Sequence, residues 1–167
     1  IERRREIMAR LKTEHNALQN SGSAVVIANR QGLIEYANPA FLRMWKYEQA
    51  DEVRGRDVRG LWSDPGSAAK LVDLPLAGDS WEGELEALRA DGGELYVHGT
   101  AAANHDGEQV VGLVLSFVDI TARRRAEQAI RREAQAQLQQ ARRRKDFAGL
   151  LHILSLTDIF QLIASTN

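Results

Sequence analysis

The stretch Glu108–Thr121, which reads EQVVGLVLSFVDIT, decides how this chain folds. From Val110 to Val118 it is an almost unbroken β-prone run of about nine residues, long enough for a strand and too short for a buried helix. Apolar and polar residues alternate poorly along it, so we expect both of its faces to be covered. A polar, strongly basic and helix-forming segment begins at Ala122. The sequence therefore predicts a central strand that leads directly into a long exposed helix, so that a change in the sheet reaches the root of the helix.

Four further strands are predicted upstream of this stretch, and turn-forming residues separate the members of each antiparallel pair. They span residues 24–28, 33–37, 81–89 and 95–103. Short helices are predicted after Asn38-Pro39 and, over 66–73, after Asp64-Pro65, because a capping residue precedes proline at both places. A loop is expected over 74–79. Runs of strands kept apart from runs of helices indicate an α+β domain with one antiparallel sheet.

Two helices are predicted to flank this domain. Residues 1–19 contain no Gly or Pro, and their apolar residues follow the alternating spacing of a narrow coiled-coil seam, although Arg4 falls on that seam. The second helix runs from Ala122 to about Lys145, and only Ile130 and Leu138 are strongly apolar along it. Because such a helix is marginal alone in water, we expect it to pair with its own copy in a dimer or with the first helix.

Composition and charge narrow the class of protein. The chain has no cysteine, which excludes disulfides and thiolate chemistry, and no apolar run approaches the roughly 18 residues of a membrane span. Residues 123–145 carry nine Lys or Arg against two Glu, whereas residues 20–122 carry eight against sixteen Asp or Glu. The basic runs lack the interleaved aromatic residues of nucleic-acid binders and suit the outer face of a coiled coil, so we expect neither nucleic acid nor membrane as a partner. We expect a cytoplasmic protein.

Residues 23–121 resemble a PAS sensor domain. The resemblance rests on short motifs that follow one another in the family's order, none of which is specific by itself. They are Asn29…Gly32 in the first turn, YANPAF (Tyr36–Phe41), Gly55-Arg56, WEGE (Trp81–Glu84), RADGG (Arg89–Gly93), Gly112 and DIT (Asp119–Thr121). The basic helix that follows is similar to the signalling helix that leaves such domains.

The PAS resemblance implies a five-stranded antiparallel sheet with short helices on one face, flanked in this chain by coiled-coil-like helices at both ends. It also implies a pocket between sheet and helices that can hold a ligand, without identifying that ligand or a cofactor. Two chemistries of the family do not fit. A flavin photosensor of this kind needs a cysteine, and a haem-binding member uses a His on the helix that corresponds to residues 66–73, where this chain has none.

The last residues, 147–167, are the most apolar segment and resemble the opening of a PATAN domain, an interaction module of bacterial signalling proteins. The resemblance rests on Phe147-x-Gly149-x-Leu151 and on LSLTDIFQLI, residues 154–163. A segment this apolar needs a partner surface, so we expect the sequence to be part of a longer protein. The domain organisation that we predict is 1–20 N-terminal helix, 21–121 PAS domain, 122–146 signalling helix and 147–167 PATAN-like start.

Six residues are candidates for lining a ligand pocket. They are Phe41, Leu42, Trp45, Trp62, Leu71 and His98. An aromatic face at helical spacing fits a closed core equally well, and His98 fits a sheet-face histidine with a hydrogen-bond partner, so both interpretations stay open. The four histidines do not fall at metal-ligand spacings and no acidic cluster accompanies them, so no metal site is predicted.

The junction Asp119-Ile120-Thr121 is the candidate signal relay. Asp119 ends the predicted strand, and the Thr121 hydroxyl is expected to cap the helix. A well-capped junction explains these residues by itself, and a cap that is remade when the sheet moves makes the same residues a switch.

The function predicted from the sequence is that of a non-catalytic sensory module in a bacterial signal-transduction protein. It would form a homodimer through its flanking helices and relay a change in the PAS domain to a downstream module. The alternatives are a ligand-free PAS dimerisation scaffold and a fragment of a histidine kinase. The last would use His152 as phosphoacceptor, but Ile153 follows where such kinases carry an acidic residue, and no ATP-binding segment is visible.

Overall fold

The computed structural model describes residues 2–19 and 22–164, without the side chains of five residues in its helices. They are Leu18, Ile153, Leu154, Thr157 and Leu162. The chain divides into two units, Ile1–Ala122 and Arg123–Asn167, each of which is described by itself. The first unit holds the whole sheet, and the second holds all but the first two residues of the last helix.

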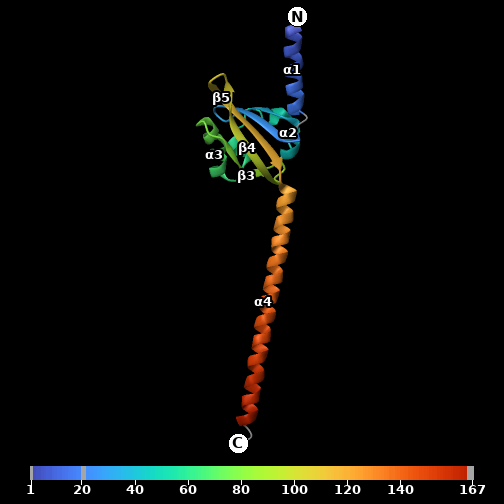
Figure 1. Cartoon of the computed structure of the whole chain (residues 1–167), viewed down its shortest axis with the longest axis vertical. Helices are drawn as coiled ribbons and strands as arrows, with labels where there is room; N and C mark the ends of the chain where they lie inside the picture. Colours follow the sequence, from blue (N-terminus) through green and yellow to red (C-terminus); the bar gives the residue numbers. More distant parts are fainter. Residues whose placement is uncertain (1, 20–21, 165–167) are drawn as a thin grey trace. The chain divides into compact units, whose positions relative to one another are not determined.

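The first unit is built on a five-stranded antiparallel sheet in the order β2-β1-β5-β4-β3 (Figure 1). The strands are β1 (Ala24–Asn29), β2 (Ile34–Ala37), β3 (Trp81–Leu88), β4 (Glu94–Asp106) and β5 (Gln109–Asp119). The α+β class, the single antiparallel sheet and the five strands predicted from the sequence are thereby confirmed. β5 pairs with β1 on one side and β4 on the other, so the stretch Glu108–Thr121 contains the central strand of the sheet.

In the middle of β5 one face is buried and the other is not. Leu113, Leu115 and Phe117 are inaccessible to solvent and face the helices, whereas Val118 on the opposite face is 50% exposed. The expectation that both faces are covered is therefore wrong for the chain as described. The expectation was based on weak alternation of apolar and polar residues, and the alternation is weak because outward positions of this strand also carry valines.

Short helices cover the buried face of the sheet, and each begins where the sequence supplies a cap. They are α2 (Pro39–Trp45), the 3₁₀ turns η1 (Ala50–Glu52) and η2 (Val58–Leu61), and α3 (Pro65–Leu76). The fully buried Asn38 accepts hydrogen bonds at 2.9 Å from the backbone N–H groups of Phe41 and Val25. This one side chain therefore caps α2 and ties it to β1.

α3 continues through Leu76 instead of ending at Asp73, so the loop predicted over 74–79 starts later. Pro75 lies inside the last turn and is buried together with Leu71 and Val72. Burial of this apolar stripe against the sheet offsets the hydrogen bond that proline removes.

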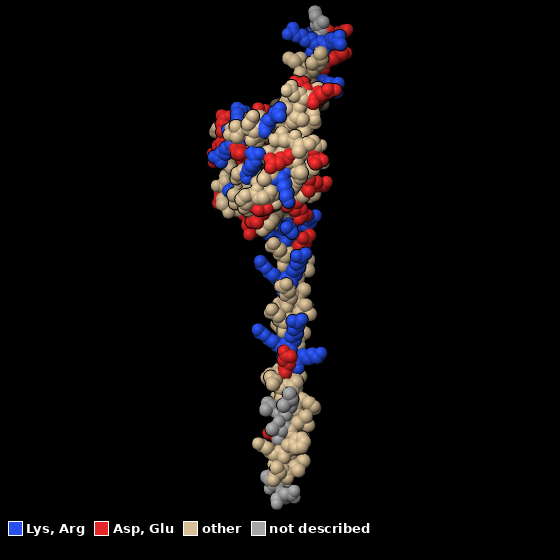
Figure 2. Space-filling model, turned by 90° about the vertical axis from the view of Figure 1, so that its left-hand side faces the viewer, with Lys and Arg blue, Asp and Glu red and all other residues tan. Residues whose placement is uncertain are grey.

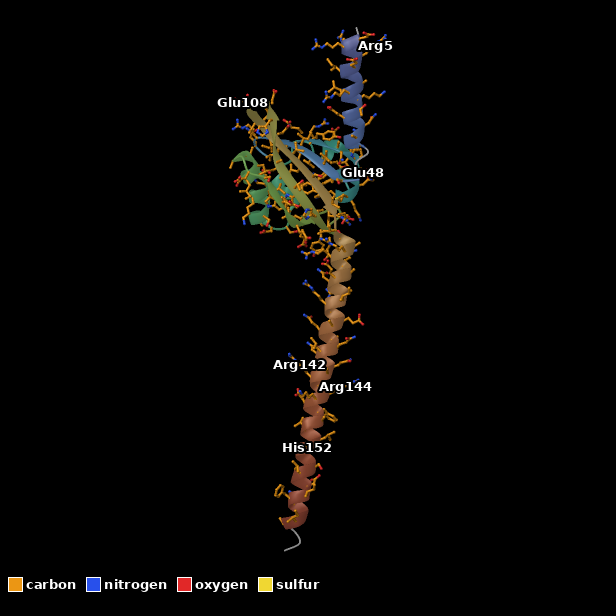
Figure 3. The ribbon with its side chains drawn as sticks, in the orientation of Figure 1. Arg5, Glu48, Glu108, Arg142, Arg144 and His152 are labelled. Atoms are coloured by element: carbon orange, nitrogen blue, oxygen red, sulfur yellow. The ribbon has the colours of Figure 1, made fainter. Side chains whose placement is uncertain are left out.

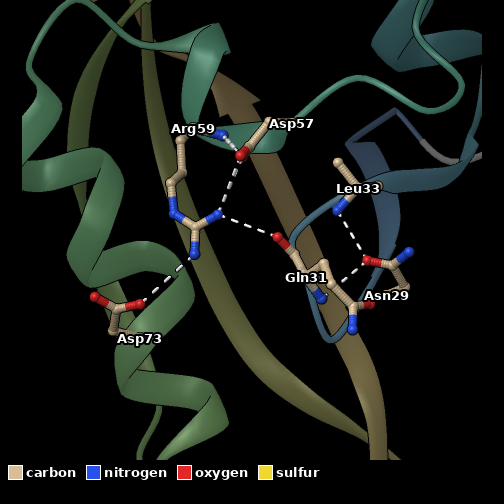
Figure 4. A network of polar contacts seen from close by, with 6 residues as sticks. All are labelled: Asn29, Gln31, Leu33, Asp57, Arg59 and Asp73. Atoms are coloured by element: carbon tan, nitrogen blue, oxygen red, sulfur yellow. Dashed lines mark hydrogen bonds and ion pairs between the residues drawn. The ribbon is translucent and has the colours of Figure 1, made fainter.

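Arg59 connects three elements of the first unit through its side chain (Figure 4). Its guanidinium donates to the carbonyl oxygen of Gln31 at 3.2 Å and lies 3.2 Å from the carboxylate of Asp57 and 3.7 Å from that of Asp73. The β1–β2 turn, η2 and α3 are thus held by a single cation. In the same turn, the Asn29 side chain accepts the backbone N–H groups of Gln31 and Leu33, which fixes the hairpin.

Helices flank the sheet in sequence, as predicted. α1 spans Glu2–Gln19, and α4 spans Thr121–Ala164 without interruption. The end of the second helix near Lys145 is wrong, because α4 runs on through the segment that follows. That segment contains no proline, and Gly149 is its only glycine, which a helix tolerates at a cost of about 1 kcal/mol.

Candidate functional site

The space between the sheet and its helices is filled by a cluster of aromatic rings. Phe41 and Trp45 stack with ring centroids 4.4 Å apart, and the edge of Trp45 meets Trp62 at 5.7 Å. Phe117 of β5 lies 5.0 Å from Trp62 and 5.5 Å from Trp45. Such edge and offset contacts give a tightly packed core. We call these four residues the aromatic cluster.

The structure brings five of the six candidate pocket residues to this region. Phe41, Trp45, Trp62 and Leu71 belong to one buried core, and Leu42 packs against it. The indole N–H groups of Trp45 and Trp62 are buried and have no hydrogen-bond partner among the described residues. Buried indoles usually find an acceptor, so this interior is apolar to a degree that leaves two donors unused.

His98 does not join that cluster. It alternates along β4 with the buried Leu95 and Val97 and therefore lies on the opposite face of the sheet. There its Nε2 lies 3.0 Å from the Glu82 carboxylate on the neighbouring strand β3; the His98 side chain is partly exposed and that of Glu82 is largely exposed. Of the two interpretations, the geometry fits the sheet-face histidine with a partner.

The candidate relay is the best-connected polar site of the domain. The Asp119 carboxylate accepts the backbone N–H of Thr121 at 2.8 Å. The Thr121 hydroxyl accepts the backbone N–H of Tyr96 at 3.0 Å, and the backbone N–H of Ile120 donates to the carbonyl of Tyr96 at 2.8 Å. Ile120 and Thr121 are both buried. The capping role therefore belongs to Asp119, and Thr121 instead extends the pairing of β4 and β5.

Arg89 is the member of this site that the sequence argument missed. It follows β3, and its guanidinium lies 3.5 Å from the Asp119 carboxylate, with only 17% of its side chain exposed. A signal was present in the sequence, because Arg89 is the only cation between Lys70 and Arg123. The ends of β3, β4 and β5 thus meet at the start of α4.

A hollow of about 250 Å³ opens beside the edge strand β2. Its lining comes from β2, α2, η1 and the end of α1, and it includes Tyr36, Leu42 and Arg54. Leu42 is thus the only candidate pocket residue that contributes to this hollow as well as packing against the core.

The second unit presents charged and apolar side chains to solvent. Figure 3 shows Arg142, Arg144 and His152 extending away from the axis of α4, and all three are exposed. Lys and Arg are spaced along the first part of α4, whereas they mix with Asp and Glu over the sheet domain (Figure 2). His152 has no acidic neighbour in sequence on its C-terminal side.

The described residues hold neither a metal-binding cluster nor a membrane-spanning helix. No three potential metal-ligating side chains converge there. None of the helices in that part of the chain is both long enough and apolar enough to cross a membrane.

Residues 22–122 match the family described as "PAS domain". The chain belongs to the PAS domain family. The match covers the sheet, the covering helices and the Asp119–Thr121 junction, and so includes the six candidate pocket residues and the candidate relay. A search of curated proteins found no match.

Solved PAS structures agree with this assignment. The PAS domain of a Colwellia psychrerythraea protein is 23% identical, with a TM-score of 0.60, and the match covers 67% of this chain and 98% of that one. The PAS domain of nitrogen regulation protein NR(II) from Vibrio parahaemolyticus is 22% identical, with a TM-score of 0.52 over 63% and 95%. At these identities both show the shared fold.

A third similar structure is the LOV domain of a blue-light activated histidine kinase from Erythrobacter litoralis EL346. It is 25% identical, with a TM-score of 0.54, and the match covers 60% of this chain and 98% of that domain. PAS domains are typical of signal-transduction sensors, and the fold found here is that of a sensory module.

Proposed function

We propose that this chain is a non-catalytic, cytoplasmic sensory and dimerisation module of a bacterial signal-transduction protein. In this proposal the PAS domain, residues 21–121, relays a change to a downstream module through the signalling helix, residues 122–146. The PAS family membership supports the sensory role. The similar LOV domain belongs to a light-activated histidine kinase, which supports a place within a larger signalling protein.

The observation that carries the proposal is the hydrogen bonding of Asp119, Ile120 and Thr121. These residues link the end of β5 to β4 and to the first turn of α4 in one connected set of bonds. A shift of β4 against β5 cannot leave that set intact. The first turn of α4 must then find new partners or fray, since its N–H groups have no partners within the helix.

The energies involved suit a switch. Each of these hydrogen bonds contributes about 1 kcal/mol net, so the junction as a whole is worth a few kcal/mol. Reversing a population from 99:1 to 1:99 takes about 5.5 kcal/mol of differential binding. A stimulus of ordinary binding strength can therefore remake the junction, and loss of any single bond cannot.

Dimerisation through the flanking helices is supported by the apolar residues that they expose. On α1, Ile7, Met8 and Leu11 are each more than half exposed, and on α4 the same holds for Ile130 and Leu138. Apolar residues at these spacings form the seam of a coiled coil. In our proposal the seam is closed by a second copy of the chain.

Residues 147–167 are proposed to open a PATAN-like interaction module. Two apolar stripes support this. At 100° per residue, Phe147, Leu150 and Leu151 fall on one side of an ideal helix, and Leu156, Ile159, Phe160 and Ile163 fall on the opposite side. A helix that is apolar all round requires burial on all sides. The stripes change sides at Ser155-x-x-Asp158, which has the spacing of a capping box, although α4 runs through these residues as one helix.

The relay is tested by coupling measurements on the dimer. Because the chain has no cysteine, Gln137→Cys places one spin label on each α4, and the distance between labels reports helix pairing. A mild core change, Trp62→Phe, should shift that distance in the otherwise unaltered protein. The shift should vanish when Asp119→Ala is added and persist when the exposed Asp79→Ala is added instead. An equal shift in both backgrounds would remove Asp119 from the relay.

The aromatic cluster favours a second candidate, a PAS scaffold without a ligand. Phe41, Trp45, Trp62 and Leu71 are packed against one another rather than around a space. Native mass spectrometry separates the two candidates. A dimer with retained extra mass supports the ligand-responsive sensor, whereas a dimer of bare chain mass favours the scaffold.

A further inference from the structure

A second hollow, of about 270 Å³, lies beside the Arg89–Asp119 pair. The end of β3, the end of β5, helix α2 and the residue that caps α2 form its wall. We call it the junction hollow, and its lining is Gly22, Ala40, Arg43, Met44, Lys46, Arg89 and Asp119. It is separate from the aromatic cluster, which contributes no residue to it.

Cations gather in the junction hollow although the domain around it is acidic. Residues 20–122 contain eight Lys or Arg and sixteen Asp or Glu, yet three of the eight cations line this one hollow. The only carboxylate in the lining is that of Asp119. A second carboxylate, Asp91, pairs with Lys46 at 2.7 Å, so these five side chains carry a net charge of +1.

Two of these cations have donors to spare. Among the described residues no carboxylate forms an ion pair with Arg43. The buried Nε–H of Arg89 has no partner there either, and the contact of its Nη2 with Asp119 is long at 3.5 Å. A guanidinium has five N–H donors in a planar fork that matches two oxygens of one anion. Arg89 is thus largely withdrawn from water with most of its donors unused.

The backbone at Lys46 provides an independent observation. Lys46 caps α2 with a φ of 61°, and it is the only non-glycine residue with a positive φ in the described chain. Glycine is the usual residue at this position, because a side chain there costs roughly 1 kcal/mol. Strained backbone of this kind is concentrated at ligand sites. The strain here places an ammonium group at the rim of the hollow.

We propose that the junction hollow binds a small oxyanion, a carboxylate or a phosphate. Its oxygens accept from the spare guanidinium donors of Arg43 and Arg89, and Lys46 supplies a third positive charge. The partial burial of Arg89 strengthens this interaction, since a charge-assisted hydrogen bond gains strength where water is excluded. Ala40 and Met44 give the hollow an apolar wall, and Asp119 is the only carboxylate of the lining that competes with the anion.

Binding also has a consequence for the relay, which rests on the proposed function. An anion on Arg89 competes with Asp119 for the same guanidinium. Asp119 also holds the N–H of Thr121, so a released Asp119 changes the cap at the start of α4. The ligand favours the state in which Arg89 has left Asp119, and it shifts the population toward that state.

The test is a titration of the whole chain with sodium phosphate and, separately, with sodium succinate, at constant ionic strength set with sodium chloride. The binding is followed by nuclear magnetic resonance, in which the Nε–H signals of Arg89 and Arg43 report on the two guanidinium groups directly. We expect the positions of these signals to shift and to saturate with at least one of the two anions. The anion that gives saturation identifies the ligand class as phosphate or carboxylate. Arg43→Gln should weaken binding at least tenfold, and the exposed Arg30→Gln on the β1–β2 turn should leave it unchanged.

Equal weakening in Arg30→Gln and Arg43→Gln, or the absence of saturation with both anions, overturns the site. Arg43 is exposed, so its variant should fold, and an unchanged melting temperature verifies that. The spin-label distance on α4 is read in the same titration. Binding with no change in that distance keeps the anion site and removes its link to the relay.

Discussion

The hydroxyl oxygen of Thr121 accepts a hydrogen bond from the backbone N–H of Tyr96 at 3.0 Å, so the first residue of α4 supplies a rung of the β4–β5 ladder with its side chain. The register of the two strands ends at Val97 and Asp119, and beyond it the Ile120 N–H donates to the Tyr96 carbonyl. A backbone donor that would be orphaned at the end of a sheet is satisfied by the helix that follows it. The sheet and the helix therefore cannot be separated without exposing this N–H.

The first prediction concerns that bond. Thr121→Val keeps the shape of the side chain and removes the hydroxyl oxygen that accepts the Tyr96 N–H. Because residue 121 is only 6% exposed, water cannot easily replace this acceptor. We expect unfolding free energy to fall by about 1–3 kcal/mol. Thr121→Ser keeps the hydroxyl and should recover most of it. Urea unfolding of both variants checks this, and equal losses in Val and Ser variants would assign the effect to packing instead.

The second prediction concerns the closest approach of β5 to β1. A Cβ at Gly112 would lie 2.1 Å from the carbonyl oxygen of Ala28, which is backbone and cannot move aside. Gly112→Ala should therefore lower the unfolding free energy by about 1–3 kcal/mol or more, since overpacking forces the strands apart.

Gly60 offers the matched control for this substitution. A Cβ there meets nothing within 4 Å, and its φ is not positive. Gly60→Ala should stay within about 0.5 kcal/mol of the unaltered protein in thermal unfolding. If both alanine variants are equally stable, β1 and β5 do not approach each other as described.

The sequence predicted the parts of the fold that local chemistry decides. Asn38-Pro39 and Asp64-Pro65 start helices because a cap and a proline act within a few residues. The sheet face on which His98 lies could also have been predicted, because His98 alternates with the apolar Leu95 and Val97 along β4.

Contacts between residues far apart in the sequence could not be predicted from the sequence alone. Arg89 and Asp119 are thirty positions apart, and their pairing depends on how β3 and β5 end in the folded sheet. The same holds for the aromatic cluster, where Phe117 of β5 closes on Trp45 and Trp62. The residue types in the sequence indicated that the interior is aromatic. Whether these rings fill the interior or surround a cavity depends on their tertiary packing.

The third prediction is a dependence of stability on pH through the cap of α3. The hydroxyl of Ser67 donates to the Asp64 carboxylate, and with the backbone N–H groups of Ser67 and Gly66 it lowers the pKa of Asp64 below its ordinary 3.8. Because the folded pKa is the lower one, the stabilisation is complete above 3.8 and is lost as the pH falls through the folded value.

Asp64→Asn keeps an acceptor oxygen at the cap and removes the titration. The unaltered protein should melt at a higher temperature than this variant at neutral pH, because a charged cap also interacts favourably with the helix N-terminus. The difference between the two melting temperatures should shrink as the pH falls below 3.8. A difference that stays constant down to about pH 2.5 would contradict the charged cap.

The last prediction separates one long helix from two shorter ones in α4. If a new helix starts at Ser155, then Leu156 is its first residue, where proline is favoured because its missing N–H has no partner to lose. Leu156→Pro should then lose no more helical circular dichroism, and no more dimer, than Leu156→Ala. In the interior of a continuous helix the same change costs about 3 kcal/mol. Gln139→Pro, within the proposed signalling helix, provides that interior reference. If Leu156→Pro loses as much helix as Gln139→Pro, residues 147–164 belong to the signalling helix and the separate module at its end has no support.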